Sequence, residues 1–242
     1  MTDTELPLPP WRRGLPKRAR PARPALGQAQ IVDAGLRIVT EEGVEAVSMR
    51  RIAAVFHTGA SSLYAHVANK EELLQLMFDR ICGDIDVPAP EPGRWRDQIR
   101  QLARSSHAVM GRYNDIARAA LATVPTGPNA LRVSEGMLAI LLAGGVPPKV
   151  ASWALDRLFL YLVADSYEGS LHAQAAAGRG VTEGEYGDTF AEQLAGYFEN
   201  LPAERFPNLR ANARVMTSGG QDERFEFGLD LIIDGVARYA RS

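Results

Sequence analysis

We expect an all-α fold on three grounds. Apolar residues recur at three- and four-residue spacings over most of the chain, clusters of Pro and Gly separate these runs, and no run shows the two-residue alternation of a strand. The chain has 242 residues, of which 46% are apolar, and a formal net charge of −2. This composition is that of a globular protein, and the length allows one large domain or two small ones.

Residues 1–26 are expected to form a disordered basic arm. They hold six prolines, which oppose a packed element, and six Lys or Arg residues against two acidic residues. Such a segment is either a solvated tail or an extension that follows phosphates or enters the minor groove of DNA. The sequence leaves both roles open.

Two helices are expected in the next part of the chain. Residues 28–42 place apolar side chains on one face, and Gly43 follows where a left-handed C-cap belongs. Ser48 can cap a second helix of about nine residues, because a serine hydroxyl accepts from the free amides of a first turn. This second helix would bury Met49 and Ile52.

A third and a fourth helix follow closely. Residues 57–59 interrupt the pattern, and a third short helix is expected over 60–67. Asn69, with Glu72 three residues later, resembles a capping box that begins the fourth helix. The chain therefore places four helices in fewer than 60 residues.

The proline-rich stretch 88–93 divides the chain into a domain of residues 27–87 and a second domain of residues 88–242. The second domain is also expected to be helical, with a polar loop over 200–222. Its expected helices cover 95–111, 115–122, 128–143, 148–177, 182–199 and 223–241.

Two features bear on location. The longest apolar stretch has 11 residues, well short of the roughly 18 that a bilayer span requires, and the N-terminus lacks the apolar segment of a secretory signal. The single cysteine, Cys82, cannot form an intrachain disulfide. We therefore expect a reduced, cytoplasmic setting and no membrane partner.

The helices on either side of residues 57–59 have the arrangement of a helix-turn-helix, whose second helix enters the major groove of DNA. No Asp or Glu occurs from residue 46 to residue 70, so this surface can approach phosphates without like-charge repulsion. Arg50 can reach a guanine edge unless it pairs with Glu45, and Lys70 can bind a phosphate at a helix N-terminus. The expected DNA-contact residues are Ser48, Arg50, Thr58, Ser61, Ser62, Tyr64, His66 and Lys70.

Several sequence blocks occur in a fixed order. They are Ile31–Val39, Glu42–Gly43, Ser48–Ala53, Ser62–Val67 and Asn69–Leu74, followed later by Arg94–Asp97, Pro125–Thr126 and Phe227–Gly235. The first five resemble the TetR family of bacterial transcriptional repressors, and the last three are similar to the C-terminal ligand-binding and dimerisation domain of its tetracycline-repressor subgroup. The resemblance implies a homodimer that binds a palindromic double-stranded operator, and a small-molecule inducer that releases it.

The chain also departs from this pattern. His57 stands where the family usually has glycine, and histidine tolerates a positive φ better than most residues. The subgroup's drug- and magnesium-binding positions hold Asp86, Leu102, Ala120 and Gly136, in place of histidine, asparagine, histidine and glutamine. These exchanges argue against tetracycline and for a largely apolar inducer, bound between helices 95–143 and 148–170. The expected ligand-binding residues are Leu102, Ser106, Ala120, Thr123, Gly136 and Tyr161.

Other interpretations stay open. One helix carries Asp165, Glu168 and His172 at a spacing that could present metal ligands. In the family that the chain resembles, this helix belongs to the dimer interface. We therefore expect a polar interface patch, and neither a metal nor a cofactor. Tyr64 and His66 could be ordinary surface residues. No nucleophile elbow, phosphate-binding loop or cysteine pair indicates an enzyme. The alternative function is a helical adaptor that binds a small molecule or a protein without DNA activity.

Overall fold

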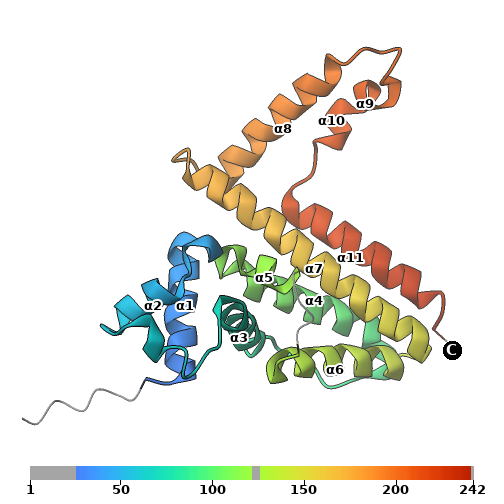
Figure 1. The fold of residues 1–242 in the computed structure, drawn as a ribbon. Helices are drawn as coiled ribbons and strands as arrows, with labels where there is room; N and C mark the ends of the chain where they lie inside the picture. The colour runs from blue at the N-terminus through green and yellow to red at the C-terminus, as the bar shows by residue number, and fades with distance from the viewer. Residues whose placement is uncertain (1–25, 122–125, 241–242) are drawn as a thin grey trace, which may run out of the picture.

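The computed structural model describes residues 26–121 and 126–240, and Figure 1 shows that their regular structure is helical throughout. No strand occurs in these two ranges, which confirms the all-α prediction. The expected arm lies outside the described residues, apart from Leu26. None of the described helices combines the length and apolar content needed to cross a bilayer.

Three helices, α1 (Gln28–Glu42), α2 (Met49–Val55) and α3 (Lys70–Cys82), form a compact unit that we call the head. Helix α1 has the predicted bounds, and its core face is fully buried. Gly43 has the expected positive φ of 84°, but its ψ of 170° is extended, so the predicted left-handed cap is wrong in that respect. The Gly43 amide donates to the Val39 carbonyl at 2.8 Å, and the 3₁₀ turn Val44–Ala46 follows directly.

The predicted third helix over 60–67 is wrong as an α-helix. A 3₁₀ turn covers Ala60–Ser62, and irregular turns continue to Val67. The segment is too short to nucleate a helix on its own, and Gly59 offers no side chain to cap one. Instead, Leu63 and Val67, which are 0% and 2% exposed, hold the segment against the head.

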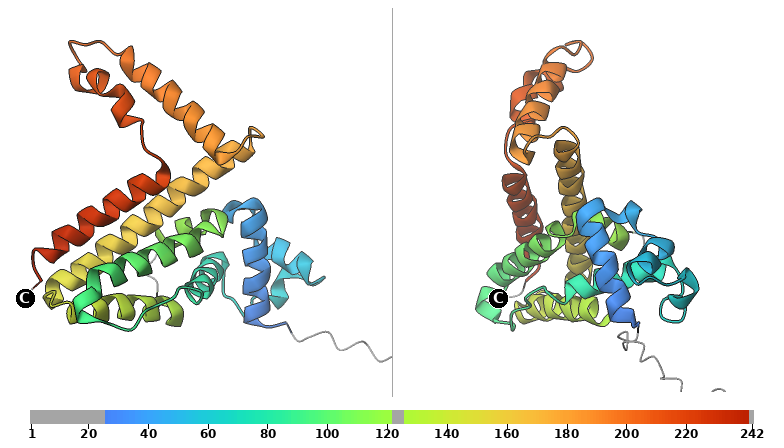
Figure 2. Two further views of the ribbon diagram at one scale, coloured as in Figure 1. Left: turned by 180° about the vertical axis from the view of Figure 1, so that it is seen from behind. Right: turned by 90° about the vertical axis from the view of Figure 1, so that its left-hand side faces the viewer.

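Five helices form a second unit, the body. They are α4 (Trp95–Gly111), α5 (Ala117–Leu121), α6 (Pro128–Ala143), α7 (Pro148–Ala177) and α11 (Gln221–Ala237). Helices α4, α6 and α7 match the predicted bounds, whereas the helix expected over 115–122 divides into a 3₁₀ turn at Asn114–Ile116 and α5. The long α7 crosses the body with α11 beside it, as both views show (Figures 1 and 2).

A third group of helices stands away from the body at the end of α7 (Figure 2). It consists of α8 (Glu183–Glu199), α9 (Pro207–Ala211) and α10 (Ala213–Met216). The polar loop predicted over 200–222 is therefore wrong in part, because it contains α9 and α10. Helices as short as α9 and α10 leave little periodicity in a sequence, which is why they were not predicted. Arg214 joins α10 to α8 through hydrogen bonds to Glu192 and Glu199, each at 2.8 Å.

Candidate DNA-contact surface and ligand cavity

The turn after α2 is built on an unusual backbone. His57 has a φ of 51°, and among the described residues no other non-glycine residue has a positive φ. This agrees with the expectation that histidine could replace the glycine of this turn. Ser48 caps α2 as predicted, because its hydroxyl oxygen accepts from the Arg51 amide at 3.2 Å.

The eight predicted DNA-contact residues all come from the head and lie on or near its surface. Tyr64 is 54% exposed, and the Thr58 and Ser62 hydroxyls are hydrogen-bonded to each other at 2.9 Å. Because Leu63 and Val67 are buried, the backbone that carries Ser61, Ser62 and Tyr64 is held against the head. Five of the eight are exposed and three are half-buried: Ser48, Arg50, Ser61, Ser62 and Tyr64, then Thr58, His66 and Lys70.

The structure also bears on the alternative proposed for Arg50. Glu45 pairs with Arg118 of α5 at 2.6 Å, so the carboxylate that could have held Arg50 is used elsewhere. Arg50 is exposed and can therefore extend away from the head. This arrangement favours the interpretation of Arg50 as a DNA contact.

Lys70 opens α3 as expected, but its surroundings are more acidic than the sequence reasoning allowed. Asn69 caps the helix by accepting from the Glu72 amide at 2.8 Å, whereas the Glu72 carboxylate accepts from Ala68, so the predicted capping box is only half formed. Glu71 and Glu72 also lie in the first turn. The positive potential at this helix N-terminus is therefore reduced, and Lys70 is the group there that suits a phosphate.

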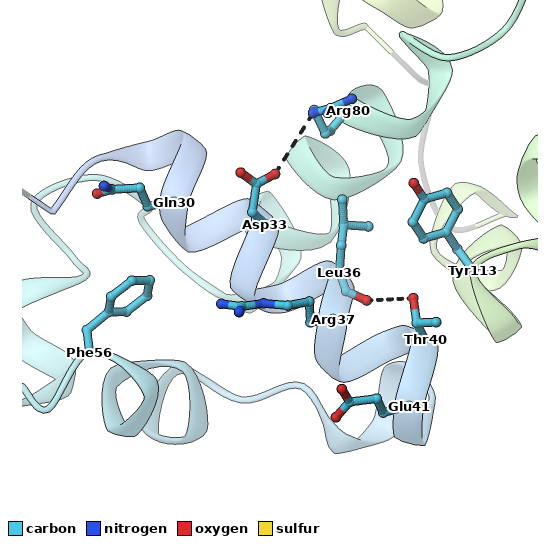
Figure 3. Close-up of a pocket in the computed structure, with 9 residues that line it drawn as sticks. All are labelled: Gln30, Asp33, Leu36, Arg37, Thr40, Glu41, Phe56, Arg80 and Tyr113. Carbon is cyan, nitrogen blue, oxygen red and sulfur yellow. Dashed lines mark hydrogen bonds and ion pairs between the residues drawn. The ribbon is translucent and has the colours of Figure 1, made fainter.

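Two hollows could hold a ligand. The first, in the head, measures about 640 Å³ and runs along α1 (Figure 3). Its lining includes Asp33, Arg37, Glu41 and Arg80, and the Asp33 carboxylate faces the Arg80 guanidinium at 3.9 Å. A lining of mutually compensating charges does not suit an apolar molecule.

The second hollow is a body cavity of about 310 Å³, enclosed by α3, α4, α5, α6 and α7. It lies in the region predicted for the ligand, and its lining is mainly apolar. Two of the predicted ligand residues, Ser106 and Ala120, line it. The apolar residues that sequence reasoning missed include Phe78, Met110, Val133, Met137, Leu155 and Phe159.

Three other predicted ligand residues lie outside this cavity. Leu102 is completely buried in the core, and Gly136 packs so closely on Val87 that a Cβ atom would lie 2.1 Å from its Cγ1. Tyr161 turns towards α11, where its hydroxyl donates to the Phe225 carbonyl at 2.8 Å. The remaining one, Thr123, lies outside the described residues.

The polar groups of the cavity are few and mostly uncharged. The Ser106 hydroxyl donates to the Leu102 carbonyl at 2.8 Å, which leaves its oxygen free to accept from a ligand. Burial raises the pKa of the Cys82 thiol to about 12, so it is neutral. No Lys, Arg or His lines the cavity in the described part of the chain, and its one carboxylate, Asp156, is exposed and paired with Arg157. A buried anionic group would find no counterion there.

The residues considered for a metal are dispersed. The Asp165 carboxylate accepts from Nε2 of His107 at 2.8 Å, and the His107 ring stacks on Phe225 with centroids 4.3 Å apart. His172 lies instead against Phe190 of α8. Within residues 26–121 and 126–240, no three His, Cys, Asp or Glu side chains lie close enough to hold a metal ion.

Comparisons with known proteins cover nearly the whole chain. Residues 31–77 match the family described as bacterial regulatory proteins, tetR family, and residues 87–239 match the tetracyclin repressor-like C-terminal domain. The repressor DrrR1 of Streptomyces coeruleorubidus is 30% identical over 227 residues, which is 93% of this chain and 82% of that protein. A class G tetracycline repressor of Vibrio anguillarum is 27% identical, over 88% of this chain and 94% of that protein.

Solved structures also match over nearly the whole chain. ActR of Streptomyces coelicolor in complex with actinorhodin is 39% identical, with a TM-score of 0.80 over 90% of this chain and 98% of that chain. ActR in complex with (S)-DNPA has a TM-score of 0.79, over 90% of this chain and all of that one. The fold and the order of the two matched regions therefore agree with one family.

Proposed function

The chain belongs to the TetR family of ligand-responsive transcriptional repressors, and from that premise we propose that it binds a palindromic operator as a homodimer and releases it when a small apolar molecule fills the body cavity. The observation that carries this proposal is the exposed surface from Thr58 to Lys70, held in place by buried Leu63 and Val67. It offers hydroxyl, imidazole and cationic groups and contains no acidic residue, although the Glu72 carboxylate approaches it at the Ala68 amide. Such groups are suited to phosphates and base edges.

Dimerisation would occur through α7 and α11. Phe227 and Leu231 are one helical turn apart on α11 and are 65% and 60% exposed. On α7, Leu171 is 45% exposed, and Leu160, which also lines the rim of the cavity, is 38% exposed. Large apolar side chains gathered on two adjacent helices favour burial against a second copy, which would form a bundle of four helices.

The ligand would be mainly apolar, with a few groups able to hydrogen-bond. The cavity volume suits a small aromatic compound, and Ser106 and Ser134 provide the polar contacts. ActR has been solved with actinorhodin and with (S)-DNPA, which supports a small-molecule ligand for this chain too. Because the lining offers no cation, we propose that the part of the ligand inside the cavity is uncharged.

A mobility-shift experiment tests the DNA proposal. The full chain should shift DNA from its own promoter region, with an affinity that depends on sequence and falls as salt is added. Tyr64→Ala or Lys70→Ala should weaken this binding and leave the dimer intact. If no genomic fragment is bound, the adaptor alternative is favoured. If neither substitution changes binding, the contact surface is misplaced.

The dimer is tested by solution mass. Light scattering should give twice the chain mass of 26.4 kDa, and Leu231→Glu should shift the molecule towards the monomer because it places a charge in the proposed interface. Glu204→Gln, on the exposed loop between α8 and α9, is the matched control and should leave the mass unchanged. A monomer in the wild-type protein would contradict the two-fold arrangement.

A further inference from the structure

Helix α6 is capped by a side chain from another helix. Its own N-cap residue is Gly127, which has no capping side chain. The Asp79 carboxylate of α3 takes this role, because Oδ1 accepts from the Asn129 amide at 3.0 Å and from the Ala130 amide at 2.9 Å. A Cβ atom on Gly127 would lie 2.2 Å from the Asp79 carboxyl group, so glycine makes the approach possible.

Helix α6 returns the interaction at the same C-terminal end of α3, where Cys82 is its last residue. The Arg132 guanidinium donates to the Cys82 carbonyl at 3.0 Å and to the Ile85 carbonyl at 2.9 Å. The last carbonyls of a helix have no partner within it and carry partial negative charge, so a cation there satisfies both needs. Each helix thus caps the other, and we call these contacts of Asp79 and Arg132 the crossed caps.

The crossed caps join α6 to α3, which is the helix of the head that also reaches the cavity. Both α3 and α6 line the cavity, through Phe78 and Cys82 on one side and Val133 and Ser134 on the other. At the same time α3 is packed tightly on α1: a Cβ on Gly35 would lie 2.7 Å from the Met77 sulfur. A displacement of α3 therefore carries the head with it.

We propose that Asp79 and Arg132 are positioning residues that fix α6 to α3, so that an occupant of the cavity which shifts α6 also shifts the head. This inference rests on the proposed ligand-dependent function and names the contacts through which it operates. Hydrogen bonds donated in both directions where the C-terminal end of α3 meets the N-terminal end of α6 resist sliding and rotation there, which the apolar packing between the helices alone would allow. Without the crossed caps, α6 could yield to a ligand while the head stayed in place.

The test replaces the unidentified ligand with a side chain. Ser134→Phe places a phenyl ring in the cavity from α6. Spin labels on Glu41→Cys of α1 and Gln101→Cys of α4, both exposed positions, report the distance between head and body. Labelled chains are diluted into unlabelled protein so that the distance within one chain is measured. Cys82 is buried and does not compete for the label.

Ser134→Phe should displace the distance distribution in the otherwise unaltered protein. In Asp79→Ala and in Arg132→Met, the same substitution should produce less than half of that displacement, and Arg132→Lys should restore most of it. Asp230→Asn, which takes the negative charge out of the 2.8 Å contact between Asp230 of α11 and Arg100 of α4, is the matched control and should leave the displacement unchanged. Circular dichroism verifies that each variant is folded. Arg132→Lys keeps the positive charge at this position, so it is a milder change than Arg132→Met.

Equal displacements with and without the crossed caps would overturn the inference, and so would the absence of any displacement in the unaltered protein. The measurement uses neither DNA nor ligand, so it is separate from the proposed function. If the distance responds as expected but no operator is bound, the crossed caps stand and the repressor proposal fails. Where an operator is bound, Ser134→Phe should weaken binding at least tenfold, and less than threefold when Arg132→Met is also present.

Discussion

Replacing Asp115 with alanine should lower the free energy of unfolding by about 2–3 kcal/mol. Asp115 is 6% exposed, and its Oδ1 accepts from the amide of Val44, itself 5% exposed, at 2.6 Å. A hydrogen bond to a charged group contributes roughly 1.5–3 kcal/mol, and its loss leaves a buried amide without a partner. Because this contact joins the 3₁₀ turn before α5 to the turn that follows α1, operator binding should weaken as well.

Glu45→Gln provides the matched comparison at the same junction. It weakens the pair between Glu45 and Arg118, whose side chains are 71% and 46% exposed, and solvent screening makes such a pair far less stabilising. Urea unfolding of the full chain measures both variants, with an unchanged dependence on denaturant as evidence that the same transition is followed. The reasoning is refuted if Asp115→Ala costs less than about 0.5 kcal/mol, or if Glu45→Gln costs as much.

Three further predictions concern other sites. His57→Val should destabilise the head by about 1–2 kcal/mol in urea unfolding because a β-branched residue resists a positive φ, whereas His57→Gly should stay close to wild type; equal stability would contradict the strained turn. Burial raises the pKa of Cys82 to about 12, so a thiol reagent should modify it only after unfolding, and rapid labelling of the native protein would contradict this. The hydrogen bond from Arg104 lowers the pKa of Glu226, so Glu226→Gln should reduce the melting temperature at neutral pH. That difference should vanish as the pH falls through the lowered pKa, and a difference that persists in acid would exclude the pair as its source.

The sequence predicts long, isolated helices better than short or interdependent ones. Helices α4, α6 and α7 were placed correctly because Pro and Gly mark their ends. The segment from Ala60 to Val67 shows helical spacing, yet its hydrogen bonds are mainly of the 3₁₀ type and do not continue as an α-helix. The burial of Leu63 and Val67 holds it against the head. Periodicity reports which face is buried and does not distinguish a helix from successive turns.

The cavity shows the same limit. Ser106 and Ala120 line it as predicted, but Tyr161 faces α11 because its hydroxyl reaches Phe225, 64 residues later in the chain. Which side of α7 faces the cavity depends on where α11 packs, and this pairing leaves no local signal. The crossed caps are equally hidden, since Asp79 and Asn129 are 50 residues apart. Contacts between helices that are far apart in the chain leave no local sequence signal, so only the three-dimensional structure shows them.

The central claim is that two copies of the surface from Thr58 to Lys70 are held at a fixed separation to enter successive major grooves. Its most direct test inserts five base pairs between the half-sites of an operator recovered with the full chain. Half a helical turn places the two half-sites on opposite faces of the duplex. The account predicts a fall in affinity of at least a hundredfold in a binding titration. An affinity equal to that for the unaltered operator would contradict it.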